Sequence, residues 1–486
     1  MSYEAVIGLE IHAQLLTKTK IFCGCRTDFG APPNSQVCPV CLGLPGALPV
    51  LNHHAVDLAI RIGLALGCTI QPTSIFARKN YFYPDLPKGY QISQYDRPIA
   101  LDGSLEWRAE GVAHRVSITR AHLEEDAGKS RHDGFTEADT RTGIDFNRSG
   151  VPLVEIVTAP DLRSGTEAAA FFSRLRVILV ALGVNDGNME EGSLRCDANV
   201  SVRPAGSTAL GTKAEVKNLN SFRFLARALD YEIERQMAIV GRGARVIQET
   251  RLWDARTGRT ESMRSKEEAH DYRYFPEPDL PPLVVSHERI EAIRASLPEL
   301  PDARRARFVT DYGLPEADAT ALVMLVPGFD EYFETTARAT GSARETANTL
   351  LGLVRSRMNQ DSIQSIGDLR TRLPEDRLAE LVVLVESGKV SRPIAREIFD
   401  EMFGTGKHAG DIVAAKGLGR IDQDEAIAPI VDQVLAAHAD AVASYRAGRT
   451  ASFGFLVGQV MRTMGGKADP KRVNELLKKE LERSGE

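Results

Sequence analysis

The sequence predicts an α+β fold, in which strands dominate the first part of the chain and helices the second. Short segments with alternating apolar and polar residues, separated by glycines, fill the first ~270 residues and are typical of antiparallel strands. A cluster of prolines follows between Pro276 and Pro301 and predicts a connector, because proline removes amide donors. Beyond this connector the apolar residues recur at helical spacing.

These changes of pattern divide the chain into three parts. Gly404-Thr405-Gly406 marks a second boundary, because glycine is frequent where helices end. We therefore expect a strand-rich domain, a helical domain and a small helical tail domain, over residues 1–295, 296–406 and 407–486.

Individual helices are predicted where apolar residues recur at three- and four-residue steps. Within the strand-rich part this spacing predicts helices over 161–183 and 221–237. In the later parts it is clearest over 377–386 and 472–483.

The composition excludes some classes of protein. With 43% hydrophobic and 26% charged residues the chain is ordinary for a globular protein. No run of consecutive apolar residues is long enough for a membrane span, and no apolar leader follows Met1, so we expect a cytoplasmic protein. The net charge of −6 excludes a surface wholly given to nucleic acid. Residues 444–486 nevertheless hold nine Lys/Arg against five Asp/Glu, which predicts RNA binding by the tail.

Four cysteines are clustered near the N-terminus as a C-x-C pair, Cys23 and Cys25, and a C-x-x-C pair, Cys38 and Cys41. Disulfides rarely persist in the cytosol, so the cluster indicates a metal. Four thiolates complete a tetrahedral shell around Zn²⁺, which is typical of a structural site. Reduced cysteines packed beside loops are the alternative.

Other metal and nucleotide motifs are absent. Zinc deaminases carry H-x-E followed by P-C-x-x-C. Here the order is reversed in Glu10-Ile11-His12, and Val37 precedes Cys38. Four cysteine ligands would also leave no position open for water. The chain contains no P-loop and no G-x-G-x-x-G, which excludes the usual phosphate-binding folds.

Several predicted strands carry polar residues on one face, opposite an apolar face. A solvated outer face is the ordinary explanation for one such strand. Several strands lining one concave surface would instead make an oxygen-rich site that suits Mg²⁺, with Lys79 and other cations offsetting phosphate charge. The residues concerned are Glu10 and His12; Glu124, Glu125 and Asp126; Arg195, Asp197 and Asn199; and Lys213, Glu215 and Lys217.

Long blocks of the sequence resemble a known family, the B subunits of aspartyl/glutamyl-tRNA amidotransferases. The resemblance covers essentially the whole chain. It is carried by residues 6–12, 78–85, 91–95, 122–129, 189–199, 217–222, 271–279 and 454–459.

The resemblance implies a fold and an activity. The fold is a cradle-shaped domain related to glutamine synthetase, followed by a helical domain and a tail domain that reach the tRNA. The activity is that of a carbon–nitrogen ligase with glutamine as amido donor. It uses ATP and Mg²⁺ to phosphorylate the side-chain carboxylate of Glu-tRNA(Gln) or Asp-tRNA(Asn), and then amidates it with ammonia. The implied partners are an amidase-type glutaminase, which channels the ammonia, a small third protein that stabilises the assembly, and the tRNA.

The resemblance also implies roles for residues. Glu10, His12, Glu125, Asp197 and Glu215 would surround the Mg²⁺ and ATP site. Lys79 and Lys88 would contact the nucleotide or line the route by which ammonia arrives. The polar faces of the predicted strands, rather than the resemblance alone, lead us to expect further contacts to the nucleotide from Glu124, Arg195, Asn199, Lys213 and Lys217. The four cysteines would hold a structural zinc.

Two other functions stay open at the level of sequence. A non-enzymatic, zinc-stabilised tRNA-binding assembly factor is disfavoured by Glu124, Glu125 and Asp126, because acids repel RNA unless a metal intervenes. A ligase acting on a free amino acid would leave the helical and tail regions without a purpose. No glutaminase nucleophile motif such as G-x-S-x-G is present, so ammonia is expected from a partner. The choice between Glu-tRNA and Asp-tRNA is not decided.

Overall fold

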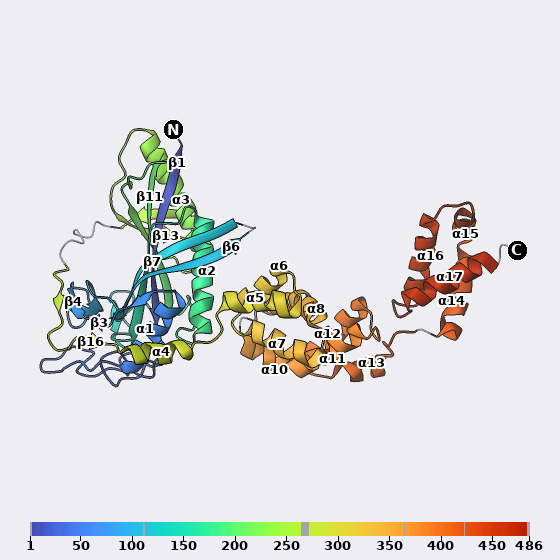
Figure 1. Cartoon of the computed structure of the whole chain (residues 1–486), viewed down its shortest axis with the longest axis horizontal. Coiled ribbons are helices and arrows are strands. Elements are labelled where there is room, and N and C mark those ends of the chain that lie inside the picture. Colours follow the sequence, from blue (N-terminus) through green and yellow to red (C-terminus); the bar gives the residue numbers. More distant parts are fainter. Residues whose placement is uncertain (1, 110–111, 264–271, 364, 422, 484–486) are drawn as a thin grey trace. The chain divides into compact units, whose positions relative to one another are not determined.

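The computed structural model describes residues 2–109, 112–263, 272–363, 365–421 and 423–483 (Figure 1). Two compact units divide the chain, Met1–Asp302 and Ala303–Glu486, and each contains apolar core of its own. Asp271, which begins one block of the family resemblance, lies outside the described residues.

The first unit is built on a mixed, 12-stranded sheet. The main path of neighbouring strands is β14-β13-β12-β11-β1-β10-β7-β5-β4-β15, and β6, which pairs β7 and β2, lies off this path. The strands are β1 Tyr3–Gln14, β2 Thr69–Ile70, β4 Phe76–Asn80, β5 Tyr90–Gln94, β6 Ala100–Ala109, β7 Val112–Glu125, β10 Pro152–Thr158, β11 Leu194–Pro204, β12 Ala214–Lys217, β13 Thr250–Asp254, β14 Arg259–Ser262 and β15 Phe275–Pro276. Two small ladders pair β3 Thr73–Ser74 with β16 Leu283–Val284, and β8 Lys129–Arg131 with β9 Gly143–Asp145.

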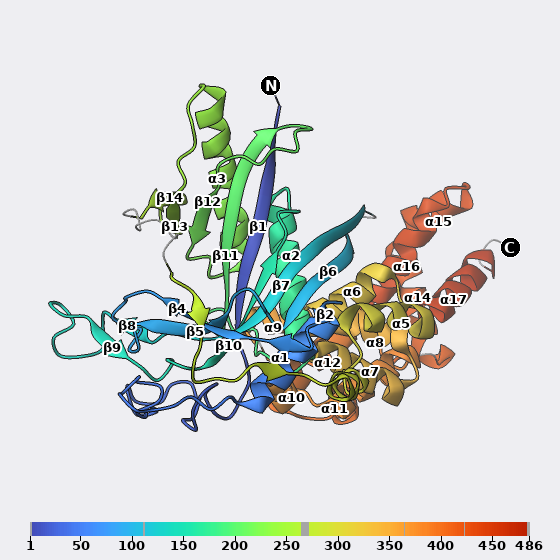
Figure 2. The same ribbon diagram turned by 60° about the vertical axis from the view of Figure 1, so that its left-hand side comes forward.

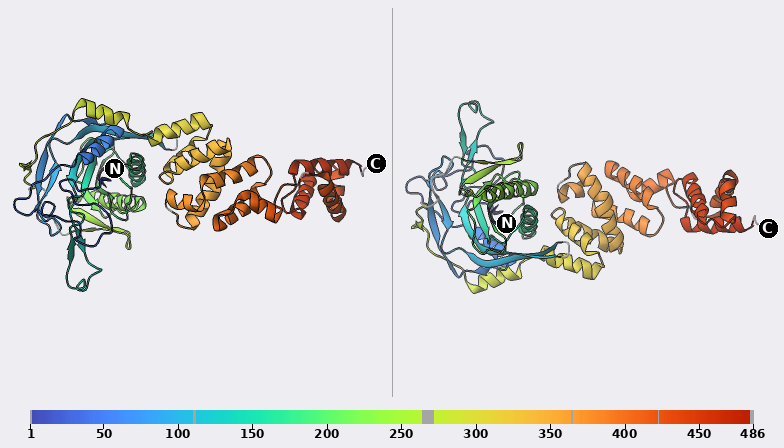
Figure 3. Two further views of the ribbon diagram at one scale, coloured as in Figure 1. Left: turned by 90° about the horizontal axis from the view of Figure 1, so that it is seen from below. Right: turned by 90° about the horizontal axis from the view of Figure 1, so that it is seen from above.

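Helices cover the apolar face of this sheet. They are α1 His53–Ala65, α2 Gly165–Ala181, α3 Phe222–Gly241 and α4 His287–Ala295. Buried residues of α1, α2 and α3 form one cluster with the apolar side chains of β1, β7, β10 and β11. Figure 2 shows β1 next to β11, and Figure 3 shows α2 and α3 side by side near these strands. Because strand side chains alternate, the polar residues of the same strands point to the other face.

The two helices predicted in this unit are confirmed, with shifted ends. Ser164 caps α2 by accepting a hydrogen bond from the Glu167 amide, which sets the first residue at Gly165. Ser221 caps α3 in the same way, through the Phe224 amide. Helix α3 then runs four residues beyond the predicted end, to Gly241.

One pair of strands departs from the antiparallel sheet that the sequence predicts. Strands β12 and β13 are parallel, with Glu215 opposite Thr250 and Lys217 opposite Leu252. Parallel neighbours need a long crossover connection, and here α3 lies between the two strands in the chain.

An irregularity interrupts the pairing of β7 with β10. Val157 lies opposite Arg120, but the next residue, Thr158, lies opposite Ile118. Thr119 is therefore an extra residue on β7, as in a β-bulge.

The second unit is helical, with one π-helical turn. Its helices are α5 Pro301–Tyr312, α6 Glu316–Met324, α7 Phe329–Thr340, α8 Ala343–Thr349, the π turn η2 Leu350–Val354, α9 Arg355–Gln360, α10 Ile366–Arg372, α11 Glu375–Glu386, α12 Arg392–Thr405, α13 Ala409–Lys416, α14 Asp424–Ala437, α15 Ala439–Arg446, α16 Ala451–Thr463 and α17 Pro470–Arg483. One apolar cluster runs from Phe308 to Leu418, and another from Ile427 to Leu481. The predicted helices over 377–386 and 472–483 correspond to α11 and α17.

Among the described helices, no single one is long and apolar enough to cross a membrane. Helices α14 and α15 pass this test of length and composition only as a pair, and they are bent by 88° relative to each other.

Candidate active site

Polar side chains from neighbouring strands form a row on the face of the sheet opposite the helices. The register places Glu10 of β1 opposite Asp197 of β11, and His12 opposite Glu155 of β10. The row continues to His122 of β7, which lies opposite Glu155. On the other side it extends to β12, where Glu215 lies opposite Asn199. We call this set of residues, with Glu124, the polar row.

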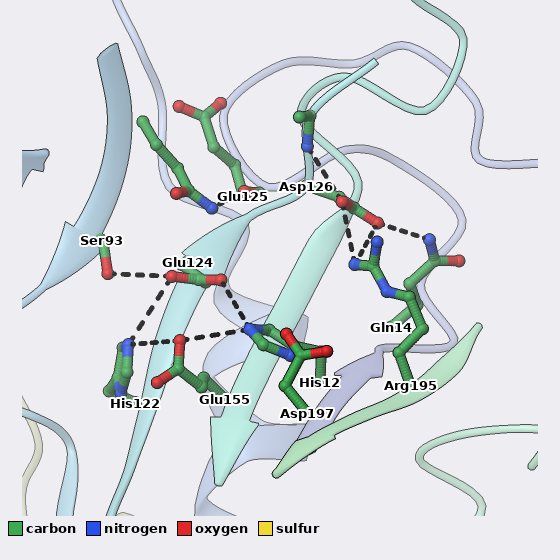
Figure 4. A network of polar contacts seen from close by, with 12 residues as sticks. His12, Gln14, Ser93, His122, Glu124, Glu125, Asp126, Glu155, Arg195 and Asp197 are labelled. Atoms are coloured by element: carbon green, nitrogen blue, oxygen red, sulfur yellow. Dashed lines mark hydrogen bonds and ion pairs between the residues drawn. The ribbon is translucent and has the colours of Figure 1, made fainter. Parts of the chain in front are cut away.

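The centre of the polar row is a cluster of two imidazoles and two carboxylates (Figure 4). His12 Nε2 lies 3.3 Å from Glu155 Oε2 and 3.9 Å from Glu124 Oε1. His122 Nε2 lies 3.6 Å from Glu124 Oε2 and 3.8 Å from Glu155 Oε2. Ser93 of β5 donates a hydrogen bond of 3.2 Å to Glu124 Oε2. One ligand atom each of His12, Glu124 and Glu155 lies within 4.8 Å of the others, which is close enough to share one cation.

The surroundings of these groups shift their pKa values in different directions. Burial raises the pKa of Glu10, and the nearby charges of Glu155 and Glu215 raise it further. Burial alone would raise the pKa of Glu124, but a hydrogen bond from His122 and the Lys79 cation lower it below its ordinary value. Burial alone would lower the pKa of His12, but its contacts with Glu155 raise it. The cluster therefore concentrates negative charge that cations must balance.

Cations stand at both ends of the polar row. Lys217 Nζ lies 2.7 Å from Asp197 Oδ2 and 2.8 Å from Glu215 Oε1. At the other end, burial alone would lower the pKa of Lys79 on β4, but the charge of Glu124 raises it. Lys79 Nζ also lies 5.1 Å from the centre of the Tyr272 ring. Both lysines are thus held as cations beside carboxylates.

A third cation, Arg195, is fixed by Asp126. Its Nη2 lies 3.0 Å from both carboxylate oxygens of Asp126. Gln14 Nε2 donates a further bond of 2.7 Å to Oδ2 of this aspartate. Burial would raise the pKa of Asp126, but the charges of Arg195 and Arg148 lower it. This network holds the guanidinium next to His12 on the neighbouring strand.

Glu10 is oriented by the neighbouring strand. Asn199 Nδ2 donates a hydrogen bond of 2.8 Å to Glu10 Oε1. Glu10, His12, Asp197 and Glu215, which the sequence predicts to share a site, therefore come from adjacent strands and lie on one face of the sheet.

The structure places Glu125, a residue of the predicted site, apart from the polar row. It follows Glu124 on β7, so its side chain points to the opposite face of the sheet. There it accepts a hydrogen bond of 2.8 Å from the Ile92 amide and forms an ion pair with Lys88. Figure 4 shows its carboxylate turned away from the cluster around Glu124. The acid of β7 at the polar row is Glu124.

Glu125 and Lys88 line a separate cavity of about 210 Å³. Its other walls include Lys20 and two of the clustered cysteines, Cys23 and Cys41. A chain of polar contacts leads from this cavity toward the polar row. Gln91 Nε2 donates to the Glu125 carbonyl oxygen at 2.6 Å, and Tyr81 donates to Gln91 Oε1 at 3.2 Å.

Lys213 lies outside strand β12, which carries Glu215 and Lys217. It lies one residue before β12 and is exposed. The alternation of the strand puts it on the side of Glu215 and Lys217.

The four clustered cysteines meet in space. Their sulfur atoms all lie within 4.8 Å of one another, which fits a single tetrahedral cation. The pKa of Cys41 falls to about 4, chiefly through its hydrogen bond with Cys23. The fully buried Lys20 places its Nζ 3.6 Å from Cys41 Sγ. A buried cation beside sulfur favours thiolates, the form that binds metal.

Comparisons with known proteins identify the family. Residues 5–291 match the GatB/GatE catalytic domain, and residues 331–481 match the GatB domain. The B subunit of the aspartyl/glutamyl-tRNA(Asn/Gln) amidotransferase of Thermodesulfovibrio yellowstonii is 53% identical over 483 residues, covering 99% of this chain and 100% of the relative. The same protein of Geotalea uraniireducens is 53% identical over 481 residues, with 99% and 100% covered. That of Myxococcus xanthus is 53% identical over 479 residues, with 99% and 98% covered.

The chain belongs to the amidotransferase B-subunit family. The family implies a ligase that acts in translation on aminoacylated tRNA. Such a ligase implies ATP and Mg²⁺, and the donors present in this B-subunit chain fit the cation. Carboxylates predominate among them, as Mg²⁺ prefers, and flanking lysines suit phosphate oxygens.

Two residues of the polar row in this family member are not predicted from sequence. Glu155 is an isolated acid within the apolar strand β10, and it is only 7% exposed. His122 lies two residues before Glu124 and is 3% exposed. A signal for Glu155 is present in the sequence, because an acid between Val154 and Ile156 must be paired or bind a cation when buried.

Proposed function

We propose that this chain activates the side-chain carboxylate of Glu-tRNA(Gln) or Asp-tRNA(Asn) with ATP and then amidates it with ammonia. The observation that carries the proposal is the polar row, in which Glu10, Glu124 and Glu155 surround His12 between flanking cations. A surface that only bound RNA would gain nothing from buried acids, because they repel phosphate. Buried acids are useful where a cation and a nucleotide bind together.

In the first step, an oxygen of the substrate carboxylate attacks the γ-phosphorus of ATP. The bond from this phosphorus to the bridging oxygen breaks, and ADP leaves with an acyl phosphate formed. The polar row would hold Mg²⁺, which would supply positive charge to the transferring phosphoryl group. Lys217 of β12 and Arg195 of β11 neutralise negative charge on the remaining phosphate oxygens. Asp126 and Gln14 keep Arg195 in place while this happens.

In the second step, ammonia attacks the acyl carbon and phosphate leaves with the electron pair of the broken carbon–oxygen bond. The nitrogen loses one proton, which the departing phosphate takes up. The cavity around Lys88 and Glu125 is the proposed place of entry for ammonia. The contacts through Gln91 and Tyr81 lead from it toward Lys79, whose charge interacts with Glu124. Polar groups along this route suit ammonia, which is a donor and an acceptor of hydrogen bonds. We propose that an amidase-type glutaminase releases the ammonia and that a small third protein stabilises the assembly.

The tail helices are proposed to bind the tRNA backbone. Among residues 423–483, the side chains of Arg449, Arg462 and Lys471 make no ion pair in the structure, so they remain available for phosphate. Arg472 differs, because it is bound to Asp424 through Nε and Nη2 and serves the packing of α14 on α17. The tail carries no base-reading motif, which suits recognition of RNA by shape.

The four cysteines are proposed to hold a structural zinc. Two of them, Cys23 and Cys41, line the cavity, so a metal there would fix the wall next to Lys88 and Glu125.

The test is formation of ADP by the complex reconstituted with its partner proteins. We expect ADP only when Mg²⁺ and charged tRNA are both present, followed by amidated tRNA when glutamine is added. ADP formation on free glutamate, with no effect of tRNA, would instead indicate a ligase for free amino acids. Binding of tRNA with no ADP formed under any condition would indicate an assembly factor.

A further inference from the structure

A row of tyrosines borders the polar row at its β4–β5 end. The order is Tyr83, Tyr81, Tyr272, Tyr274 and Tyr95, with ring centroids separated by 5.9, 5.9, 6.2 and 4.1 Å in turn. We call these residues the tyrosine row. Its members come from two parts of the chain distant in sequence, the region of β4 and β5 and the segment before β15.

The last ring of the tyrosine row, Tyr95, is exposed and lies parallel to its neighbour. The first contacts in the row are edge-on, with interplanar angles of 64°, 70° and 76°. The last contact differs, because Tyr95 lies nearly parallel to Tyr274, at 9°. Tyr95 is also 53% exposed. An exposed aromatic ring stacked on a second ring offers a plane on which another flat group can stack.

The tyrosine row is connected to the carboxylates of the polar row. Lys79 Nζ lies 5.9 Å from the centre of the Tyr81 ring and 5.1 Å from that of Tyr272. The same ammonium group interacts with Glu124 and Glu155. Ser93, two residues before Tyr95, donates a hydrogen bond to Glu124. A group stacked on Tyr95 would therefore have its attached atoms close to the reacting centre.

Stacking on aromatic side chains is how proteins hold unpaired nucleotides. It tolerates any base, since every base has a π-face, and it favours single-stranded ends. The amino acid of a charged tRNA is attached to such an end, the unpaired 3′-terminal adenosine. The acyl group must lie at Glu124 and Glu155 for the proposed reaction, so the base that carries it must be held nearby.

We propose that the tyrosine row binds the 3′-terminal nucleotide of the charged tRNA, whose base stacks on Tyr95. This proposal rests on the proposed function and adds the place at which the end of the substrate is held. It assigns Tyr95 as a positioning residue.

The test uses the full reconstituted complex and a tRNA in which 2-aminopurine replaces the 3′-terminal adenine. Stacking quenches the fluorescence of this base, so the signal reports position and needs no catalysis. We expect strong quenching with the unaltered chain and with Tyr95→Phe, which keeps the ring. With Tyr95→Ala we expect most of the quenching to be lost. KM for charged tRNA should rise about tenfold, with KM for ATP unchanged. Phe29→Ala, at a 70% exposed ring outside the row, is the matched control and should change neither quantity.

Three results would overturn the proposal. One is absence of quenching with the unaltered chain. Another is that Tyr95→Phe behaves like Tyr95→Ala, because the hydroxyl and not the ring would then matter. The third is a rise in KM for ATP with tRNA binding unchanged, which would mean that the Tyr95 ring stacks on the adenine of ATP. If the unaltered complex quenches the fluorescence and forms no ADP, the proposed function fails and the stacking site stands.

Discussion

At the scale of residues, two adjacent glutamates of β7 have different surroundings. Glu124 contacts two histidines and a serine on the polar face, whereas Glu125 pairs with Lys88 in a cavity on the other side. The proposed roles differ accordingly. Glu124 would help to hold the cation for phosphorylation, and Glu125 would act on the path of ammonia.

Substituting the two glutamates separately should separate the two half-reactions. We expect Glu124→Gln to lower the rate of tRNA-dependent ADP formation by roughly 100-fold, because a charge that fixes the cation is lost. Glu125→Gln should leave ADP formation within about threefold of normal and slow the transfer of ammonia from glutamine. The measurement is ADP release and amidated tRNA in the same reaction. Equal loss of ADP formation in both variants would contradict this assignment.

The site can be predicted in part because alternation is a local property of a strand. Glu10, His12, Asp197 and Glu215 follow from it, since each lies on a polar face opposite an apolar one. The sequence does not separate Glu124 from Glu125, because a run of acids does not say which member faces which side. The tyrosine row could not be predicted, because Tyr95 and Tyr274 are brought together only by the pairing of strands distant in sequence.

At the scale of elements, the N-terminal loops bring the sulfur atoms of four cysteines close together, and these cysteines are the proposed ligands of a zinc ion. We expect about one zinc ion per chain by elemental analysis, since four thiolates complete one tetrahedral shell. Cys25→Ser should lose most of this zinc and lower the thermal stability. Cys68→Ser, at a buried cysteine outside the cluster, is the control and should retain the metal. Full zinc content in Cys25→Ser would contradict the prediction.

Hydrogen bonds to Glu334 join helices α5 and α7. Glu334 of α7 accepts hydrogen bonds from Arg307 Nη1 at 2.6 Å and Tyr312 at 2.9 Å, both on α5. The hydrogen bonds from Arg307 lower the pKa of Glu334 to about 2. A lowered pKa means that the stabilisation is complete above the unfolded value of about 4.3 and is lost as the pH falls toward 2.

Removing this carboxylate should therefore destabilise the helical unit in a pH-dependent way. We expect Glu334→Gln to lower the free energy of unfolding by about 2 kcal/mol at pH 7. The difference from the unaltered chain should shrink as the pH falls below about 4. Urea unfolding followed by circular dichroism at several pH values measures both. Glu331→Gln, at a side chain that is 61% exposed, should have little effect. A difference that stays constant down to pH 2 would exclude Glu334 as the titrating group.

At the scale of the whole molecule, the change from strands to helices was predictable, because periodicity and the proline cluster both mark it. The sequence places it after residue 295, and the first compact unit ends at Asp302. The extent of the second apolar cluster is less apparent from sequence. Gly406 ends α12 in a left-handed conformation, as a glycine boundary suggests, but α13 still buries Ala409 and Ile412 in the same cluster. Glycines mark the ends of helices, and packing decides which helices share a core.

Because α13 packs with the helices before it, a truncation that removes only the tail should end after α13. A chain ending after Arg420 keeps the cluster from Phe308 to Leu418 and removes α14 to α17. We expect it to bind tRNA at least tenfold more weakly in the complex, with a smaller dependence of affinity on salt, because phosphate contacts are lost. Glutaminase activity of the partner should be unaffected. A chain ending after His408 would lose α13 as well and should unfold more readily. An unchanged dissociation constant at matched salt would exclude the tail from tRNA binding.

The extra residue on β7 decides which glutamate reaches the polar face. Before Thr119, the even-numbered Val116 and Ile118 lie in the apolar core, and after it the odd-numbered Ala121 and Leu123 do. The bulge thus changes which residues of β7, the even-numbered or the odd-numbered ones, face the apolar core. Without it, His122 and Glu124 would both be turned toward the apolar helices, and Glu125 would be turned toward His12 of β1. A substitution of either acid would change one side chain. Deletion of a single residue between 119 and 124 would instead exchange the faces to which Glu124 and Glu125 point.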